Sequence, residues 1–290
     1  MNLWQQYLRP GSVTEALQAL SSAPAPVCAI AGGTDLMLDL LQGRHPPVHT
    51  LVDLTCIPEM NVIEIRGEEL FIGAATPLGH IAASQLVAEH AQALTEACGL
   101  IAGPQVRNVA TLGGNVAHAL PAADGTIALT ALDAQVLVAD LDGCRHVPLS
   151  ELFLGPGRTA LKSGQELLVG FYLPLRRSGQ ASAFKRVMRA QGIALPILNM
   201  TIWLERMAGS ISLIRISAGP SGPTPRRLPM TEETFYGQPF TPEGCDRALG
   251  VMLNEVHFRS SPHRASAEYR QHLAGVLLYD TLQTAWQRTG

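Results

Sequence analysis

AGGTDL, residues 31–36, sets a glycine pair between a short apolar run and a polar side chain, and TLGGNV, residues 111–116, repeats the arrangement. Glycine has no Cβ and adopts positive φ without steric cost, so consecutive backbone N–H groups can turn towards one ligand. A concave row of N–H groups binds anions without lysine or arginine. Two such rows in one chain predict a diphosphate that is held from both sides.

The first glycine pair joins two predicted elements, a buried strand over residues 26–30 and a helix over residues 35–41. At such a junction the loop amides and the helix N-terminus can face an anion together. The stretch has neither the GxxxxGK[ST] pattern of a P-loop nor the GxGxxG pattern of a dinucleotide-binding Rossmann fold. These two classes are therefore disfavoured, although a single Gly-Gly turn can also be purely structural.

The second glycine pair lies in a long segment, residues 103–124, that we expect to be irregular. A loop of this length inside a compact domain usually has a function. Thr111 and Asn115 can donate hydrogen bonds to phosphate or hydroxyl oxygens, whereas an ionised Asp124 can only accept them. Asp124 therefore suits the hydroxyl groups of a sugar. It could equally cap the helix that we predict from Gly125, and both interpretations remain open.

Periodicity predicts strands and helices along the rest of the chain. The predicted strands are 51–54, 61–65, 70–74, 135–140, 144–148, 166–173, 181–188, 197–205 and 210–217. The predicted helices are 77–101, broken near Ser84, then 125–132, 228–235, 242–255 and 264–286. The last three strands indicate an antiparallel meander, and helices follow it, which is typical of the α+β class. The polar stretch 176–180 is the candidate domain boundary.

Composition excludes several classes of protein. The formal net charge is −3, 16% of residues are charged, and basic residues form no cluster larger than a pair, so we expect no nucleic-acid partner. The five cysteines are scattered without a metal-ligand spacing, and we see no signal peptide, which predicts reduced thiols in the cytoplasm. No apolar run is long enough to span a membrane.

Seven stretches of the chain resemble, in order, the FAD-binding medium subunit of the xanthine dehydrogenase and carbon monoxide dehydrogenase family, the molybdenum hydroxylases. The resemblance covers essentially the whole chain. It rests on residues 31–36, 106–124, 155–159, 166–168, 183–185, 224–227 and 266–273.

The resemblance implies a two-part FAD-binding domain of the vanillyl-alcohol-oxidase or PCMH type over residues 1–176, with subdomains of about 1–57 and 58–176. It implies a second domain over residues 180–290, similar to the C-terminal domain of carbon monoxide dehydrogenase flavoproteins. This small domain would contain a three-stranded antiparallel sheet and helices.

The family also implies a set of cofactor contacts. Residues 29–36 and the segment from Thr111 to Asn115 would surround the FAD diphosphate, while Leu168 and Lys185 would lie near the ring system. From the residues alone, Leu168 could be an ordinary core residue and Lys185 an ordinary surface lysine. The implied FAD-binding residues are Ala29, Ile30, Ala31, Gly32, Gly33, Thr34, Asp35, Leu36, Ile101, Thr111, Gly113, Gly114, Asn115, Asp124, Leu168 and Lys185. The resemblance implies no catalytic residue and no metal ligand in this chain.

Two departures from the family pattern stand out. His118 precedes Pro121 where relatives usually have a small polar group, and it could be a polar contact or a satisfied loop histidine. Some relatives insert a cysteine-rich 4Fe–4S segment before the Pro-Ala-Ala-Asp stretch. This chain has no cysteine there, so we expect no such cluster.

The family further implies a relay function. Substrate would be hydroxylated at a molybdopterin cofactor in a large subunit, and electrons would pass through 2Fe–2S clusters of a small subunit to FAD in this chain. NAD+ or another oxidant would accept them, within a doubled heterotrimer of large, medium and small subunits. The alternatives are a self-contained FAD-dependent oxidase of the same flavin-binding fold and a flavin-free interaction module.

Overall fold

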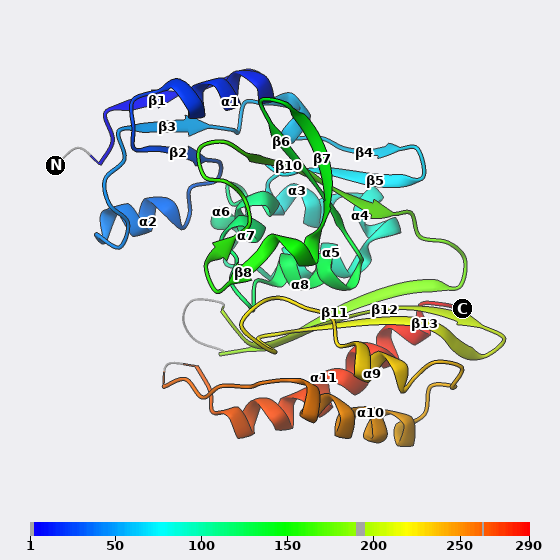
Figure 1. Cartoon of the computed structure of the whole chain (residues 1–290). Coiled ribbons are helices and arrows are strands. Elements are labelled where there is room, and N and C mark those ends of the chain that lie inside the picture. Colours follow the sequence, from blue (N-terminus) through cyan, green and yellow to red (C-terminus); the bar gives the residue numbers. More distant parts are fainter. Residues whose placement is uncertain (1–2, 190–194, 263) are drawn as a thin grey trace.

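The computed structural model describes residues 3–189, 195–262 and 264–290, and its elements form three stacked parts (Figure 1). The first part is a three-stranded parallel sheet in the order β1-β3-β2, with two helices beside it. Its elements are β1 (Gln6–Leu8), α1 (Val13–Ser22), β2 (Val27–Ile30), α2 (Leu36–Leu41) and β3 (Thr50–Asp53). The loop between β2 and α2 is the first glycine stretch.

The second part is a five-stranded antiparallel sheet in the order β4-β5-β10-β6-β7, packed with short helices. Its strands are β4 (Ile63–Arg66), β5 (Glu69–Gly73), β6 (Gln135–Asp140), β7 (Gly143–Pro148) and β10 (Leu167–Pro174). Its α-helices are α3 (Leu78–Ala83), α4 (Gln85–His90), α5 (Gln92–Leu100), α6 (Pro104–Arg107), α7 (Leu112–Ala117) and α8 (Asp124–Ala131). Smaller pieces are the 3-10 turns η1 (Pro58–Met60) and η2 (Leu149–Leu152) and the hairpin β8 (Phe153–Gly155) with β9 (Arg158–Thr159).

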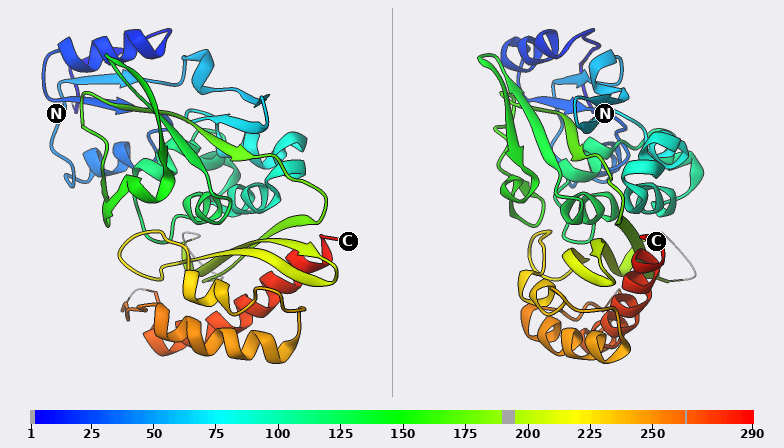
Figure 2. Two further views of the ribbon diagram at one scale, coloured as in Figure 1. Left: turned by 45° about the vertical axis from the view of Figure 1, so that its right-hand side comes forward. Right: turned by 90° about the vertical axis from the view of Figure 1, so that its right-hand side faces the viewer.

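The third part is an antiparallel meander followed by helices. It contains β11 (Gln180–Met188), β12 (Pro196–Met207), β13 (Ser210–Gly219), α9 (Pro229–Glu233), α10 (Pro242–Glu255) and α11 (Ala267–Gln287). The meander lies between two layers of helices: α5 and α8 pack on one face and α11 on the other (Figure 2). The first nine residues of β12 are all buried, as expected for a strand that is covered on both faces.

The packing forms two main cores. The larger one is built from α1, the five-stranded sheet and the helices α3, α4, α5, α7 and α8. The other is built from the meander, the residues on either side of α9, and the helices α10 and α11. Phe184 of β11 and Trp203 of β12 belong to the larger core, although the meander contributes most of its apolar side chains to the other. The meander therefore joins the second and third parts through shared packing.

The α+β class and the three-stranded antiparallel sheet with helices are confirmed. The expectation of an irregular segment over residues 103–124 is wrong, because α6 and α7 lie within it. Pro104 stands in the first turn of α6, and the Thr111 side chain caps α7, so both helices have ordinary start signals. The region 77–101 has an additional break at Ala91. The structure also has α1, which the periodicity above does not predict.

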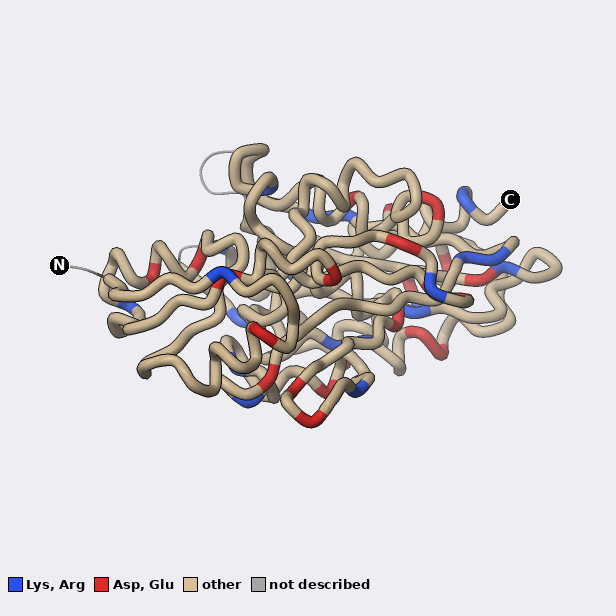
Figure 3. Tube along the Cα trace, turned by 90° about the horizontal axis from the view of Figure 1, so that it is seen from above, with Lys and Arg blue, Asp and Glu red and all other residues tan. Residues whose placement is uncertain are grey.

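Basic and acidic positions are scattered along the trace of the described chain, and the basic ones form no long run (Figure 3). Among the described helices, none combines the length and the apolar character that crossing a membrane requires.

Candidate functional site

The two glycine stretches meet in space through their backbones. A Cβ placed on Gly32 would lie 2.1 Å from the carbonyl oxygen of Val109 and 2.7 Å from the Cα of Ala110. These two residues immediately precede Thr111, so the β2–α2 loop packs directly against the entry to α7. Only glycine permits this approach.

The first stretch leaves its amides available. The N–H groups of residues 32–36 donate to no described residue, and α2 begins at Leu36 with Asp35 as a cap residue that makes no side-chain cap bond. Gly33 adopts a φ of +66°, which turns the loop at this point. A run of unsatisfied N–H groups that leads into a helix is suited to a phosphate group.

The second stretch uses its amides within the protein. The N–H of Leu112 donates to Thr76 O at 3.2 Å, that of Gly113 to Ala74 O at 2.8 Å and that of Gly114 to Thr111 Oγ1 at 3.1 Å. The prediction of a second row of free amides is therefore wrong. Thr111 starts a helix here, and the residues after β5 supply the remaining acceptors.

Asn115 connects α7 to α8. Its Oδ1 accepts hydrogen bonds from the Thr126 backbone N at 3.1 Å and from Thr126 Oγ1 at 3.3 Å. Its side-chain NH2 group donates to no described residue, which leaves two donors available on α7. His118, one turn further on, lies with Nε2 3.9 Å from Asp35 Oδ1, so the histidine faces the first stretch.

Asp124 is the first residue of α8, and its carboxylate is buried between domains. Arg186 of β11 forms an ion pair with Oδ2, and Asn199 Nδ2 of β12 donates to Oδ1 at 2.6 Å. The Asp124 side chain is 4% exposed and that of Arg186 is 3% exposed. The capping interpretation is wrong, because Ala123 is the cap residue of α8 and the carboxylate points to the meander.

Burial determines the electrostatics of Asp124. Removal from water raises the pKa of this carboxyl above its usual value, while the charge of Arg186 and the hydrogen bonds from Asn199 and Arg186 lower it again. On balance the pKa stays above the usual value. Arg186 is thus the main group that favours the ionised carboxylate.

Three other predicted contacts, Ile101, Leu168 and Lys185, lie in different environments. Ile101 is half-buried at the end of α5, and Leu168 is a buried core residue of β10 beside a β-bulge. Lys185 precedes Arg186 in β11, so the two side chains point to opposite faces of the strand. That alternation places Lys185 on the face of Ala183, towards the C-terminal core. Contacts of Leu168 and Lys185 with a flavin stay predictions.

Arg186 and Asn199 are absent from the residues that sequence reasoning selected. Arg186 lies 62 positions from Asp124 and Asn199 lies 75 positions from it, so no local motif connects them. One signal was available for Arg186. It follows Lys185 in a strand, where a period of two places one of the two basic residues on each face.

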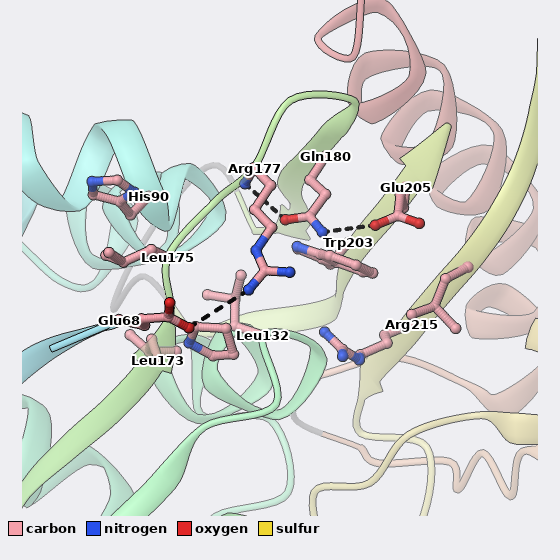
Figure 4. A pocket seen from close by; sticks show the side chains of 12 residues that line it. Glu68, His90, Leu132, Leu173, Leu175, Arg177, Gln180, Trp203, Glu205 and Arg215 are labelled. Carbon is pink, nitrogen blue, oxygen red and sulfur yellow. Dashed lines mark hydrogen bonds and ion pairs between the residues drawn. The ribbon is translucent and has the colours of Figure 1, made fainter. Parts of the chain in front are cut away.

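A separate cleft of about 480 Å³ lies at the C-terminal end of β10, between residues 173–180 and the strands β12 and β13 (Figure 4). Several of its polar groups have partners: Arg177 Nη2 lies 3.8 Å from Glu68 Oε2, and Gln180 Nε2 donates to Glu205 Oε2 at 2.8 Å. The buried Nδ1 of His90, which also lines the cleft, makes no hydrogen bond with the described residues. The guanidinium of Arg215 lies 4.3 Å from the ring centroid of Trp203. None of the predicted cofactor contacts lines this cleft.

The comparison with known sequence families identifies two domains in the chain. Residues 3–176 match the FAD binding domain in molybdopterin dehydrogenase, and residues 182–285 match the CO dehydrogenase flavoprotein C-terminal domain. The chain belongs to this family. It is therefore a FAD-binding subunit of the molybdenum hydroxylase type, and its activity is that of an oxidoreductase subunit.

Curated relatives match the chain over nearly its whole length. A putative xanthine dehydrogenase FAD-binding subunit of Escherichia coli is 30% identical and covers 98% of this chain and 97% of the relative. The carbon monoxide dehydrogenase medium chain of Hydrogenophaga pseudoflava is 29% identical, with the same coverage. A solved structure of carbon monoxide dehydrogenase from that organism, which lacks the Mo-pyranopterin moiety, superposes with a TM-score of 0.92 at 29% identity. It covers 99% of this chain and 98% of the solved chain.

The residues of this chain fit the cofactor of its family. The free amides of residues 32–36 can bind a diphosphate without neutralising side chains, and the free NH2 group of Asn115 lies on the neighbouring helix. The buried Asp124 lies where α8 meets the meander, next to the end of α5 that carries Ile101. The structure thus brings Asp124 and Ile101, two of the predicted contacts, into one region where α5, α8 and the meander meet.

Proposed function

We propose that this chain accepts electrons from 2Fe–2S clusters of a partner subunit and delivers them, through FAD, to NAD+ or another oxidant. The observation that carries this proposal is the run of unpaired amides over residues 32–36, packed against the entry to α7 through Gly32. Bound FAD would supply reversible electron acceptance, and the protein would supply binding and electrostatics.

Most of the predicted contacts then have a proposed role. The amides of residues 32–36 would donate to the FAD diphosphate, and the NH2 group of Asn115 would add donors from α7. Asp124 would accept from a hydroxyl group of the cofactor. Ile101 and Leu168 would provide apolar surface for the ring system. No role is proposed for Lys185, because its side chain lies on the face of β11 opposite Arg186.

The proposed partners follow from the same family. A large subunit would carry the molybdopterin and the substrate, and a small subunit would carry 2Fe–2S clusters. We propose a doubled heterotrimer, which sedimentation of the purified complex tests directly. A complex with one copy of each subunit would contradict the doubled stoichiometry without affecting the flavin site.

The flavin assignment is tested by reconstituting the full chain with FAD and recording its absorption after gel filtration. We expect bound flavin in the wild type and its loss in Gly33→Ala, because a Cβ at a φ of +66° distorts the loop that holds the free amides. Gly209→Ala is the matched control. Gly209 has a φ of +80° in an open turn, so the backbone strain is similar and the site is untouched. Wild-type protein without flavin bands would contradict the proposal.

The relay role is tested in the complex with its partner subunits. Under anaerobic conditions NADH should bleach the flavin absorption if NAD+ is the physiological acceptor, and an unchanged spectrum would indicate another oxidant. Oxidation of purines or aldehydes by the isolated chain would instead support the self-contained oxidase. Loss of the partner subunits should abolish substrate-dependent flavin reduction.

A further inference from the structure

Arg186 stands at the junction of three elements. From β11 its Nη1 donates to the carboxylate of Asp124 at the start of α8, and its Nη2 donates to the carbonyl oxygen of Leu100 at the end of α5. Leu100 precedes Ile101, which is also a predicted cofactor contact. A single guanidinium from the C-terminal part thus connects two neighbouring segments of the proposed flavin site.

We propose that Arg186 is a positioning residue of the FAD site, which holds Asp124 ionised and fixes it relative to the end of α5. This inference rests on the proposed function, because it assumes that Asp124 faces FAD. It adds a residue of the C-terminal part to the machinery, and it assigns that part a role in setting the charge of the flavin pocket.

The geometry requires an arginine. Its planar fork can donate to a carboxylate and to a separate carbonyl at the same time, whereas a lysine offers one point charge. The Leu100 carbonyl belongs to the last turn of α5, where the helix dipole favours a positive charge. Asn199 completes the arrangement, since its Nδ2 donates both to Asp124 Oδ1 at 2.6 Å and to Ala122 O at 3.1 Å.

The charged and titratable groups around Asp124 come from two elements. Arg186 approaches from β11, and the thiol of Cys98 lies on α5, where burial raises its pKa so that it stays neutral. Asn199 on β12 is polar but does not titrate. Removing Arg186 would therefore leave burial as the dominant influence, and the pKa of Asp124 would rise further.

A second ion pair between the same parts provides a matched control. Arg288 Nη2 pairs with Glu96 on α5, and Arg288 Nη1 donates to Ser182 O of β11 at 2.8 Å. These side chains are 27% and 26% exposed, and they touch no predicted cofactor contact. Arg288→Met thus removes a link between the two parts without changing the surroundings of Asp124.

The experiment measures the dissociation constant of FAD for the full chain between about pH 5 and about pH 9. Protonation of Asp124 should weaken binding, so affinity falls as the pH drops below the folded-state pKa. In Arg186→Met that midpoint should move to higher pH, with up to about tenfold weaker binding for each pH unit below it. Arg186→Lys should keep the wild-type midpoint, because it keeps the charge, but it should bind FAD more weakly at every pH, because a lysine cannot reproduce the arginine fork that donates to both Asp124 and Leu100 O.

Two further variants separate positioning from general stability. Asp124→Asn combined with Arg186→Met should remove the part of the pH dependence whose midpoint moves in Arg186→Met, because the carboxyl of Asp124 is then gone. Arg288→Met should show the wild-type midpoint. Should Arg186→Met fail to fold, Arg186→Gln and Arg186→Lys replace it. The midpoint of FAD binding should then move to higher pH only in the glutamine variant.

The possible failures can be told apart. If the wild type binds no FAD, the proposed function fails and this inference fails with it. If the wild type binds FAD but Arg186→Met or Arg186→Gln keeps the wild-type midpoint, only the role of Arg186 is overturned. A shift of equal size in Arg288→Met would also overturn it, because any broken link between the two parts would then suffice.

Discussion

The β2–α2 loop and the start of α7 carry the same Gly-Gly signature and use it differently. In the loop, the amides of residues 32–36 donate to no described residue, whereas the amides of residues 112–115 all have acceptors within the protein. The difference arises from what surrounds each glycine pair. Thr111 caps its helix, and Ala74 and Thr76 accept from the next turns, while Asp35 makes no cap bond. One glycine pair thus leaves its amides open, and the other uses its amides to hold α7 in place.

We expect the largest effect from Gly32→Val, which removes the contact between the two regions. The new Cβ would lie 2.1 Å from the Val109 carbonyl oxygen, and backbone cannot move aside cheaply. We predict loss of FAD retention and a decrease of about 3 kcal/mol in the free energy of unfolding, measured by urea denaturation.

Gly155→Val is the control for this substitution, because a Cβ on Gly155 meets nothing within 4 Å. It should leave both flavin content and unfolding free energy near the wild-type values. A Gly32→Val protein of native stability would show that the two stretches are not held together by this contact.

The next effect concerns the free amides themselves. Gly33→Ala and Gly209→Ala should each lose about 1 kcal/mol of stability through strain at positive φ. Only Gly33→Ala should weaken FAD binding, by about tenfold or more, because only its loop carries the proposed diphosphate donors. Fluorescence titration of both variants with FAD makes the comparison, and equal affinities would argue against a cradle at residues 32–36.

A smaller effect is expected from Thr111→Val. This change removes the hydroxyl that accepts from Gly114 N at 3.1 Å, and the loss of a helix cap costs about 1 kcal/mol. Thr111→Ser keeps the hydroxyl and should remain close to wild type in the same thermal unfolding experiment. If the serine variant lost as much stability as the valine variant, the contribution of Thr111 to stability would not come from capping alone, and packing of its methyl group would also contribute.

Gly114→Ala should have the smallest effect. Gly114 lies within α7, where alanine is favoured over glycine by about 1 kcal/mol, and its new Cβ would meet Thr111 Oγ1 at 3.1 Å. These contributions nearly offset each other. We expect FAD affinity within about threefold of wild type. A loss as large as that of Gly33→Ala would show that the second stretch contacts the cofactor through its backbone after all.

The regular elements could be predicted because their patterns are local. The strands around the Arg66-Gly67 turn alternate, and the C-terminal meander has three periodic runs separated by turn residues, so both are recovered. The sequence does not predict the short helices α6 and α7, because α6 begins with a proline and α7 contains a glycine pair, and both residue types usually indicate a loop. Their start signals, Pro104 and Thr111, are single residues that tertiary contacts support.

The candidate site was only partly predictable. The glycine stretches are visible because glycine has a distinctive conformational range, and Asp124 stands out as an acidic residue at the end of the second stretch. Which amides remain free depends on acceptors such as Ala74 and Thr76, which lie far along the chain. The partners of Asp124 come from the meander, and their position follows from packing of the whole domain rather than from any local pattern.

Phe184 and Trp203 lie in the C-terminal meander but are buried in the larger core of the preceding part. A fragment that ended before β11 would expose the apolar surface that these two aromatic side chains cover. Recombination with a distantly related C-terminal third would therefore succeed only if the incoming segment carried aromatic side chains of matching shape. Across evolution, substitutions at Phe184 and Trp203 should covary with residues of the second part, rather than with the C-terminal helices that follow them in the chain.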